Sequence, residues 1–419
     1  MKKNLFFLFL LPALFCGCSA NPDNIPPEPG TSEKNNNATE TTAATTAPEN
    51  EENEKGFEGL VFEREICVSN AVGSGNVYSR MAVLQDGRMI CIWPTTDGGK
   101  RCMKGVFSSD DGLTWGTPQV LFYGEDQTKT LANAEIIQLD NGDILIAYRA
   151  NDKEITNGNF YSSIRVHVSH DNAKTFVPHS IVKELYETGV SGSVGLWEPN
   201  FCMLNGELAC FVAIGKSVYT TPIIPSTDIY IWRDNTWVRA DYTSDDTGKT
   251  NRNGMPIVRQ LSTGGYLMSV ETARFKTARN SPLLTYLLYS ADGKHWTGLT
   301  SAHLPVYGAT NGSPYWVELP DGRIVVAFQT DEDILGTGIE AVGDKNKITK
   351  IVVSKKDVAV EDLHSVSFSE AYDPFGTMPG YFALWPAMLI HKDYLYLYAG
   401  TNDPVGHIAL VRAYIGDLK

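Results

Sequence analysis

A pattern that returns six times from about residue 57 onward limits what this chain can fold into. Each copy has a short polar or proline-containing start, an alternating strand, a turn with Gly or Asp, and an apolar strand. The turns fall near residues 87, 142, 206, 265, 322 and 393. This spacing suits a four-stranded antiparallel blade, and six blades closed in a ring form a β-propeller, which protects its strand edges. We therefore predict an all-β, six-bladed propeller over residues 57–419.

The third copy, residues 196–208, shows the pattern most clearly. Its Asn205-Gly206 dipeptide is a strong signal for a two-residue hairpin, because both central residues of such a turn need a positive φ. Glu198 stands at the start of the first strand, between Trp197 and Pro199, where a carboxylate can be held rigidly at the rim of a sheet. The alternative fold is a row of β-sandwich domains, but the even spacing of the copies lacks linker-like breaks.

The N-terminus reads as a targeting segment. Lys2-Lys3 precede an apolar run from Leu5 to Phe15, which is too short to span a membrane stably. A small residue directly before Cys18 resembles a bacterial lipoprotein signal, so we expect residues 1–18 to be a signal peptide and Cys18 to be the lipidated first residue. The alternative is an ordinary cleaved secretory signal.

Residues 19–56 contain almost no bulky apolar side chains and are rich in Pro, Asn, Thr and Glu. Such a segment cannot bury enough surface to offset the entropy of ordering, so we predict a disordered tether. Together these features predict an exported protein, lipid-anchored to a bacterial membrane and facing the periplasm or the cell surface.

The composition narrows the partners and cofactors. The formal net charge is −14 and no Lys/Arg cluster stands out, which argues against nucleic acid. The eight His show no paired ligand spacing, so we expect no catalytic metal and no cofactor, although a structural calcium stays open. We expect a monomer. Cysteines flank two hairpins and could form disulfides or lie as buried thiols: Cys91 and Cys102, and Cys202 and Cys210.

Residues 108–115 match the pattern S-x-D-x-G-x-T-W in full, and two weaker copies follow at residues 169–176 and 290–296. In such a turn the Asp and Ser/Thr side chains bond local backbone amides. These turns resemble the Asp-box repeats of the sialidase superfamily of propellers, in which the box is structural. The resemblance implies no catalytic role for Asp110, Asp171 or Asp292.

In a propeller, the starts of the innermost strands surround a central depression. Aromatic faces and polar groups gather at these positions, which suits a sugar because its C–H faces pack on rings while its hydroxyls need hydrogen bonds. The candidate substrate-binding residues are Arg80, Asn133, Glu135, Arg149, Trp197, Arg274, Tyr315 and Trp385.

Two acids stand out among the candidates. Glu198 opens the third copy, and Glu271 ends the strand that follows the turn of the fourth copy. Adjacent blades could therefore present both to one pocket. Glycoside cleavage needs two carboxylates that flank the scissile bond, one as proton donor and the other as nucleophile or general base. The alternative for each is a solvated Glu on the rim.

Three segments resemble glycoside hydrolase family 93, the exo-α-1,5-L-arabinanases. They are Leu196 to Pro199, Arg252 to Glu271, and Gly312 to Tyr315. The resemblance implies that Glu198 is the nucleophile and Glu271 the acid/base of a retaining, exo-acting hydrolase. The implied substrate is the non-reducing end of linear α-1,5-L-arabinan, from which short oligosaccharides are released.

Two other functions remain open from the sequence. An exo-sialidase would need three arginines around the substrate carboxylate and a Tyr–Glu nucleophile pair; Arg80 could be one of the arginines, but Trp385 stands where a sialidase places its Tyr. The other is a surface glycan-binding lipoprotein that keeps the propeller without turnover.

Overall fold

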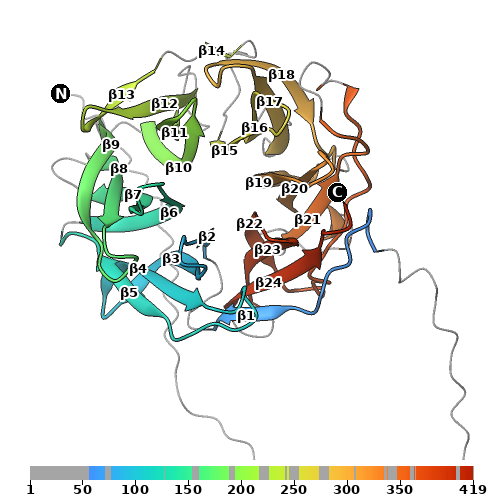
Figure 1. Ribbon diagram of the computed structural model, residues 1–419, viewed down its shortest axis with the longest axis horizontal. Coiled ribbons are helices and arrows are strands. Elements are labelled where there is room, and N and C mark those ends of the chain that lie inside the picture. The colour runs from blue at the N-terminus through green and yellow to red at the C-terminus, as the bar shows by residue number, and fades with distance from the viewer. Residues whose placement is uncertain are drawn as a thin grey trace, which may run out of the picture. The chain divides into compact units, whose positions relative to one another are not determined.

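The computed structural model confirms an all-β, six-bladed β-propeller (Figure 1). The described residues belong to the unit that spans Glu51–Lys419. They are residues 56–70, 77–126, 128–152, 160–187, 194–216, 226–240, 243–244, 254–272, 283–305, 308–334, 337, 347–358, 363, 365–402 and 406–418. Cys18, the predicted signal peptide, Arg274 and nearly all of the predicted tether lie outside them. Within the described part, no helix is long and apolar enough to cross a bilayer.

Each blade is one antiparallel sheet whose first strand lies nearest the axis (Figure 1). Blade 1 contains β2 (Arg80–Val83), β3 (Met89–Asp97), β4 (Lys100–Ser108) and β5 (Gln119–Tyr123). Blade 2 contains β6 (Thr128–Gln138), β7 (Ile144–Asp152), β8 (Phe160–Ser169) and β9 (Val177–Glu187). Blade 3 contains β10 (Val194–Leu204), β11 (Glu207–Lys216), β12 (Ser226–Arg233) and β13 (Thr236–Arg239).

The other three blades follow the same order with small variations. Blade 4 contains β15 (Gly254–Gln260), β16 (Tyr266–Thr272), β17 (Leu284–Ser290) and β18 (His295–Ser301), with the short β14 (Thr243–Ser244) pairing parallel to β18. Blade 5 contains β19 (Asn311–Glu318), β20 (Ile324–Thr330) and β21 (Ile348–Val353), and a short 3-10 helix, η2 (Glu332–Ile334), follows β20. Blade 6 contains β22 (Ala383–His391), β23 (Tyr394–Thr401) and β24 (His407–Tyr414).

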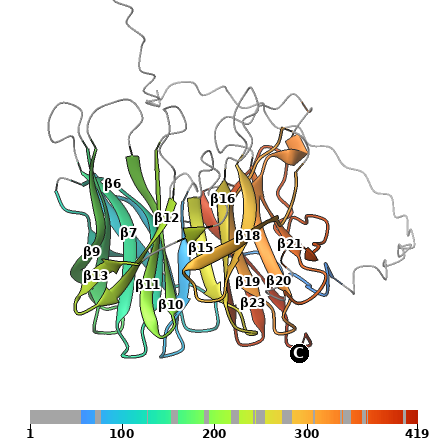
Figure 2. The same ribbon diagram turned by 90° about the horizontal axis from the view of Figure 1, so that it is seen from above.

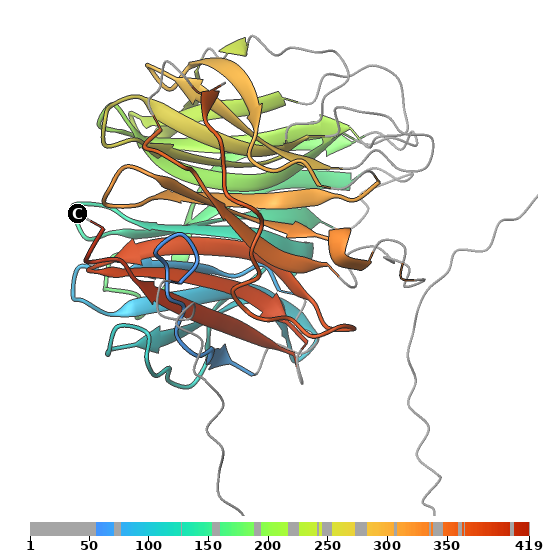
Figure 3. The same cartoon turned by 90° about the vertical axis from the view of Figure 1, so that its right-hand side faces the viewer.

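The ring closes through a strand from the other end of the chain. β1 (Ile66–Ser69) pairs antiparallel with β24 and completes blade 6, with Ile66 opposite Leu410. Figures 1 and 3 show this blue segment against the red C-terminal strands. The strand thereby ties both ends of the propeller into one sheet and covers an edge that would otherwise be open.

The second strand of each blade is buried on both faces, as its apolar sequence predicts. In β7, Ile144 and Ile146 pack in the core shared with blade 1, whereas Leu145 and Ala147 pack in the core shared with blade 3. Because successive side chains of a strand point to opposite faces, one short apolar run serves two cores. This explains why the sequence pattern of these strands is continuous rather than alternating.

The five cysteines of the described residues are free thiols: Cys67 is exposed, whereas Cys91, Cys102, Cys202 and Cys210 are buried. Cys202 and Cys210 lie on the same hairpin but on opposite faces of the sheet, because each packs in a different inter-blade core. Cys91 pairs with Val106, so it is well removed in register from Cys102. Of the two outcomes that the hairpin spacing left open, the structure shows the reduced one.

The ring has two distinct ends. We call the end at which the inner strands begin the start face, and the end at which they turn into the second strands the turn face; the short turns lie along the lower edge of Figure 2. The predicted Asn205-Gly206 turn is present on the turn face, with φ values of 51° and 84°.

The Asp-box turns follow the third strands, so they also lie on the turn face. Asp110 accepts hydrogen bonds from the backbone N–H and the hydroxyl of Thr114 at 2.9 and 2.6 Å. Asp171 accepts the same two bonds from Thr175. The Asp boxes therefore stabilise turns through local hydrogen bonds, and they lie at the end of the ring opposite the predicted site.

Candidate active site

The inner strands share a distortion near the start face. β-Bulges interrupt the pairing of β6, β10, β15, β19 and β22 with their neighbours. Four of these bulges contain a non-glycine residue with a φ of 49° to 53°: Asn133, Met255, Ser313 and Trp385. Such backbone is uncommon for residues with a side chain, and bulges redirect side chains next to functional sites. The repeated distortion marks the start face as a specialised surface.

Glu198 lies within the bulge of β10 and is 6% exposed. Its carboxylate Oε2 accepts a hydrogen bond from the backbone N–H of Met255 in blade 4 at 3.2 Å. This bond crosses the blade boundary and fixes the carboxylate near the start face. The Glu198 carboxylate is therefore fixed by a hydrogen bond and shielded from solvent.

Glu271 lies near the end of β16, opposite Gly254 of β15, and is 5% exposed. Its Oε2 accepts a hydrogen bond from the backbone N–H of Ser313 in blade 5 at 3.0 Å. A Cβ on the neighbouring Gly312 would lie 2.9 Å from the same oxygen, so the approach of β19 to this carboxylate needs a residue without a side chain. The motif glycine thus has a packing reason.

Both acids are connected to the dipeptide Gly254-Met255 of β15. Gly254 pairs with Glu271 across the sheet of blade 4, and the next residue, Met255, donates its N–H to Glu198. Both carboxylates are therefore held at the same end of the ring by adjacent blades. The spacing of the repeat predicted two acids from adjacent blades, and their joint action on one bond stays a prediction.

Side chains from five blades lie around the axis below these acids, and we call this set the polar belt: Arg80, Glu135, Asn200, Arg259 and Tyr315. Nε of Arg80 lies 3.6 Å from Oε2 of Glu135, and both side chains are at least nine-tenths buried. Asn200 donates its Nδ2 to the same Glu135 oxygen at 3.2 Å. Its Oδ1 accepts the N–H of Val258 at 2.8 Å. The belt thereby links blades 1 to 4.

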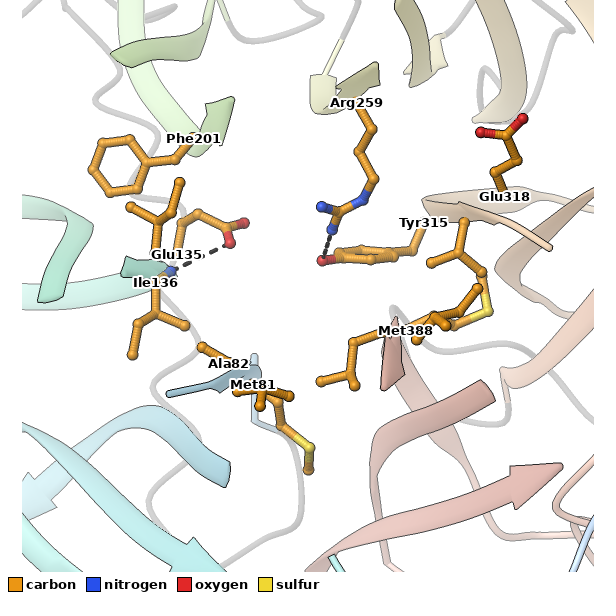
Figure 4. Close-up of a pocket in the computed structure, with 14 residues that line it drawn as sticks. Met81, Ala82, Glu135, Ile136, Phe201, Arg259, Tyr315, Glu318 and Met388 are labelled. Carbon is orange, nitrogen blue, oxygen red and sulfur yellow. Dashed lines mark hydrogen bonds between the residues drawn. The ribbon is translucent and has the colours of Figure 1, made fainter. Parts of the chain in front are cut away.

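The other half of the polar belt is a cation and a phenol. Arg259 donates a hydrogen bond to the Tyr315 hydroxyl at 2.5 Å, drawn in Figure 4. Its guanidinium carbon also lies 5.1 Å from the centre of the Tyr315 ring. Tyr398 accepts the N–H of Met81 at 2.8 Å, which connects blade 6 to blade 1 just beside the belt.

Tyr78 is a site residue that sequence reasoning missed. It is 6% exposed, with the Arg80 guanidinium 3.9 Å from its ring centre and the Trp385 ring 6.4 Å away. Burial raises the pKa of Tyr78, Arg80 lowers it, and the charge of Glu198 raises it again. The phenol is therefore protonated at neutral pH and available as a hydrogen-bond donor near Glu198. Its place directly before the strand of the first repeat was the signal available in the sequence.

The remaining candidates fall into three groups. Arg80, Glu135 and Tyr315 are buried in the polar belt, below the start face. Trp197 is partly exposed and carries the Arg149 guanidinium 4.5 Å above its ring. Asn133 and Trp385 are the partly exposed bulge residues of β6 and β22, and Arg274 lies outside the described residues.

In the part of the chain that the structure describes, no three His, Cys, Asp or Glu side chains come together in a group that could hold a metal ion. The described residues of the start face include two carboxylates, a phenol and aromatic rings. A pair of carboxylates with aromatic surfaces around it is the equipment that glycoside hydrolysis requires.

The fold and this site define a class: a six-bladed β-propeller with two acids on its start face. No protein-family model and no curated protein matches the sequence. Solved structures match over nearly the whole propeller. The GH93 α-L-arabinofuranosidase of Fusarium graminearum, in complex with arabinobiose, is 17% identical with a TM-score of 0.60, covering 85% of this chain and 99% of that chain.

Two further structures share the fold. An α-L-arabinanase of Penicillium chrysogenum with arabinobiose is 17% identical, with a TM-score of 0.60 and coverage of 84% of this chain and 98% of that chain. The NanB sialidase of Streptococcus pneumoniae is 13% identical, with a TM-score of 0.53 and coverage of 85% and 71%. These matches confirm the expected fold. Because the identities are low, the substrate and the roles of individual residues have to be argued from the site of this protein.

Proposed function

We propose that this protein is an exo-acting retaining glycoside hydrolase that releases short oligosaccharides from the non-reducing end of α-1,5-L-arabinan. Glu198 is the nucleophile and Glu271 the acid/base. The observation that carries the proposal is the placement of both carboxylates on the start face, held around Gly254-Met255 by adjacent blades. The shared fold with arabinobiose-bound propellers supports the choice of sugar.

The proposed reaction has two steps. In the first, the Glu198 carboxylate attacks the anomeric carbon while the Glu271 carboxyl gives its proton to the leaving oxygen, so that a covalent glycosyl-enzyme forms. In the second, Glu271 takes a proton from water, which attacks the same carbon and releases the sugar with its configuration retained. Tyr78 contributes a hydrogen bond beside the nucleophile, because its buried phenol keeps its proton.

The surroundings of the acids support substrate binding at this face. Trp197 and Trp385 are partly exposed aromatic residues on the bulges of blades 3 and 6. A sugar ring presents C–H groups that pack on such faces. We further propose that the protein works outside the cytoplasm, anchored by a lipid on Cys18.

The test is chromatography of digests from a panel of glycans. The panel contains linear α-1,5-L-arabinan, arabinan with its non-reducing ends blocked, sialyllactose and several plant and host polysaccharides. We expect a short product from linear arabinan and none from the blocked chain. Release from blocked chains would contradict exo action, and release from another glycan alone would contradict the sugar assignment.

A second candidate function is favoured by Tyr78. The notion of an exo-sialidase requires a Tyr–Glu pair, and Tyr78 lies near Glu198 with Arg80 against its ring. In that case sialyllactose in the same panel yields free sialic acid and arabinan yields nothing. If neither is cleaved while a glycan binds, the third function applies, that of a surface glycan-binding lipoprotein.

A further inference from the structure

The start of β19 is fastened to blade 4 directly beside Glu271. Ser313, the residue whose N–H bonds Glu271, follows Gly312 and has a φ of 53°. Backbone of this kind is strained for a residue with a side chain, and it persists only where the surroundings hold it. The residue before Gly312 is Asn311, which is fully buried. The contacts of Asn311 therefore bear on how firmly the Ser313 N–H is held.

The backbone of Asn311 is bonded at the start of β17. Its N–H donates to the carbonyl of Leu283 at 2.9 Å, and its carbonyl accepts the hydroxyl of Thr285 at 2.9 Å. Thr285 is the residue of β17 that pairs with Glu271 of β16. The segment that carries the bulge of β19 is thus attached to the strand next to the acid.

The side chain of Asn311 adds two further bonds to blade 4. Its Oδ1 accepts the backbone N–H of Thr285 at 2.8 Å, and its Nδ2 donates to the carbonyl of His303 at 2.6 Å. His303 follows β18, so one amide reaches both β17 and the segment after β18. Because its oxygen and its nitrogen both bond backbone groups, the buried amide is fixed in one orientation.

Blade 6 repeats the backbone docking without this amide. Ala383 stands where blade 5 has Asn311; its N–H also donates to a carbonyl of the preceding blade, and its carbonyl accepts the hydroxyl of Thr349 at 2.9 Å. Thr349 pairs with Gln329, which occupies the place of Glu271. The fold therefore forms this junction with an alanine. The Asn side chain is present at the junction whose N–H bonds a carboxylate.

We propose that Asn311 is a positioning residue for the acid/base, which holds the Ser313 N–H against the Glu271 carboxylate. The role rests on the proposed function of Glu271. Because Asn311 is fully buried, it acts through the backbone of β19 and not on the sugar itself. Without the amide, the N–H should leave the carboxylate for part of the time. The acid/base is then misaligned with the leaving oxygen, and small misplacements of a reacting group are costly in rate.

The test compares two aryl α-1,5-L-arabinobiosides, one with phenol and one with 2,4-dinitrophenol as the leaving group. Phenolate is a poor leaving group and needs the proton of the acid/base, whereas 2,4-dinitrophenolate departs without it. We expect Asn311→Ala to lower kcat/KM about tenfold or more for the phenyl glycoside, a part of the usual acid–base contribution, and to leave that of the dinitrophenyl glycoside nearly unchanged. A loss of folded protein lowers both values equally, so equal losses would overturn the proposal.

Three further variants give matched comparisons. Thr285→Val removes the hydroxyl that bonds Asn311 and should act like Asn311→Ala in a milder form, which keeps the test decisive if the latter does not fold. Thr285→Ser keeps the hydroxyl and should behave as the wild type. Thr349→Val removes the equivalent bond between blades 5 and 6 and should leave the ratio of the two kcat/KM values unchanged. An equal change of this ratio in Thr349→Val and Thr285→Val would contradict a specific role.

Hydrogen–deuterium exchange with mass spectrometry reads the hold on β19 without any substrate. The peptide that contains Ser313 should exchange faster in Asn311→Ala and in Thr285→Val than in the wild type and in Thr349→Val. If the wild type cleaves neither glycoside, the proposed function fails, and the exchange still decides whether Asn311 holds Ser313. Unchanged exchange in Asn311→Ala overturns the inference whatever the activity.

Discussion

Glu271 and Gln329 occupy the same position in adjacent blades. Each is the residue of the second strand that pairs with the last residue before the bulge of the first, Gly254 and Gly312 respectively. Each side-chain oxygen accepts, at 3.0 Å, the backbone N–H of the bulge residue in the next blade. The hydrogen bond that Glu271 accepts is therefore found in blade 5 as well. Blade 4 differs from blade 5 in that the acceptor is a carboxylate rather than an amide.

This relationship predicts the effect of Glu271→Gln. The amide oxygen should still accept the N–H of Ser313, as Gln329 does for Trp385, so stability should change little. Turnover should fall by about 10² to 10⁴, the usual contribution of a general acid–base group. The measurements are kcat on linear arabinan and the midpoint of urea unfolding.

The matched control for this experiment is Gln329→Ala. That change leaves the part-buried N–H of Trp385 without its acceptor, which should cost about 1 kcal/mol of stability. Its kcat should fall far less than that of Glu271→Gln. If Glu271→Gln instead lowers stability and activity together, the residue is a structural cap and not the acid/base.

The polar belt predicts a stability effect at Glu135. Glu135→Gln removes the charge that faces Arg80 at 3.6 Å in a buried environment and leaves the guanidinium without its partner. Breaking a buried pair in this way costs about 3 to 5 kcal/mol. Asp126→Asn is the control, since its pair with Lys100 is solvent-exposed and such pairs contribute little. Equal urea midpoints for the two variants would show that the belt does not hold the blades together.

A buried imidazole in blade 2 predicts a pH dependence of stability. His167 stacks on Phe122 at 3.9 Å between ring centres, and burial, with Arg165 as the second cause, lowers its pKa to about 4. Because the unfolded chain binds the proton more readily, stability is fully present above about pH 6.5 and falls as the pH drops toward 4.

Protonation of this one group lowers the free energy of unfolding by roughly 3 kcal/mol between pH 6.5 and pH values below 4. The figure follows from a pKa difference of about 2.5 between the unfolded and folded states, at 1.36 kcal/mol per pKa unit. His167→Phe keeps a ring against Phe122 and removes the titration. Its stability loss between pH 7 and pH 4.5 should therefore be smaller than that of the wild type, as measured by urea unfolding at both values. Parallel losses in the two proteins would show that the imidazole is not the titrating group.

The proposed anchor predicts a lipid on Cys18. In a bacterial host that modifies lipoproteins, the wild type should incorporate labelled palmitate and fractionate with membranes. Cys18→Ala should do neither, while its propeller keeps its activity. Labelling that persists in the variant, or a soluble wild type, would favour the ordinary secretory signal.

The sequence predicted the fold because the repeat is local. Each hairpin turn, such as Asn205-Gly206, and each apolar second strand depends on residues close in the chain, and all six turns lie where the spacing placed them. Glu198 and Glu271 were selected because each stands at a fixed place in a repeat and in a segment that resembles a known family, and their catalytic roles stay a prediction. The two-face burial of strands such as β7 follows from their continuous apolar sequence.

The polar belt could not be found in this way. Asn200 contacts Glu135, and Arg259 contacts Tyr315, across 65 and 56 residues respectively. Such bonds depend on how adjacent blades face each other, which no local pattern records. Tyr78 was missed because its neighbours Arg80, Glu198 and Trp385 come from three blades. The bulges have positive φ at residues that are not Gly, so the usual glycine signal for such backbone was absent.

The most direct test of the two-glutamate account compares the wild type with Glu198→Gln on linear α-1,5-L-arabinan, with kcat and the Kd for an arabino-oligosaccharide measured on both. Removal of a nucleophile that acts in the transition state should lower kcat by several orders of magnitude and leave Kd within a few-fold. Unchanged turnover in the variant, or a wild type that binds the oligosaccharide and never cleaves it, would contradict the account.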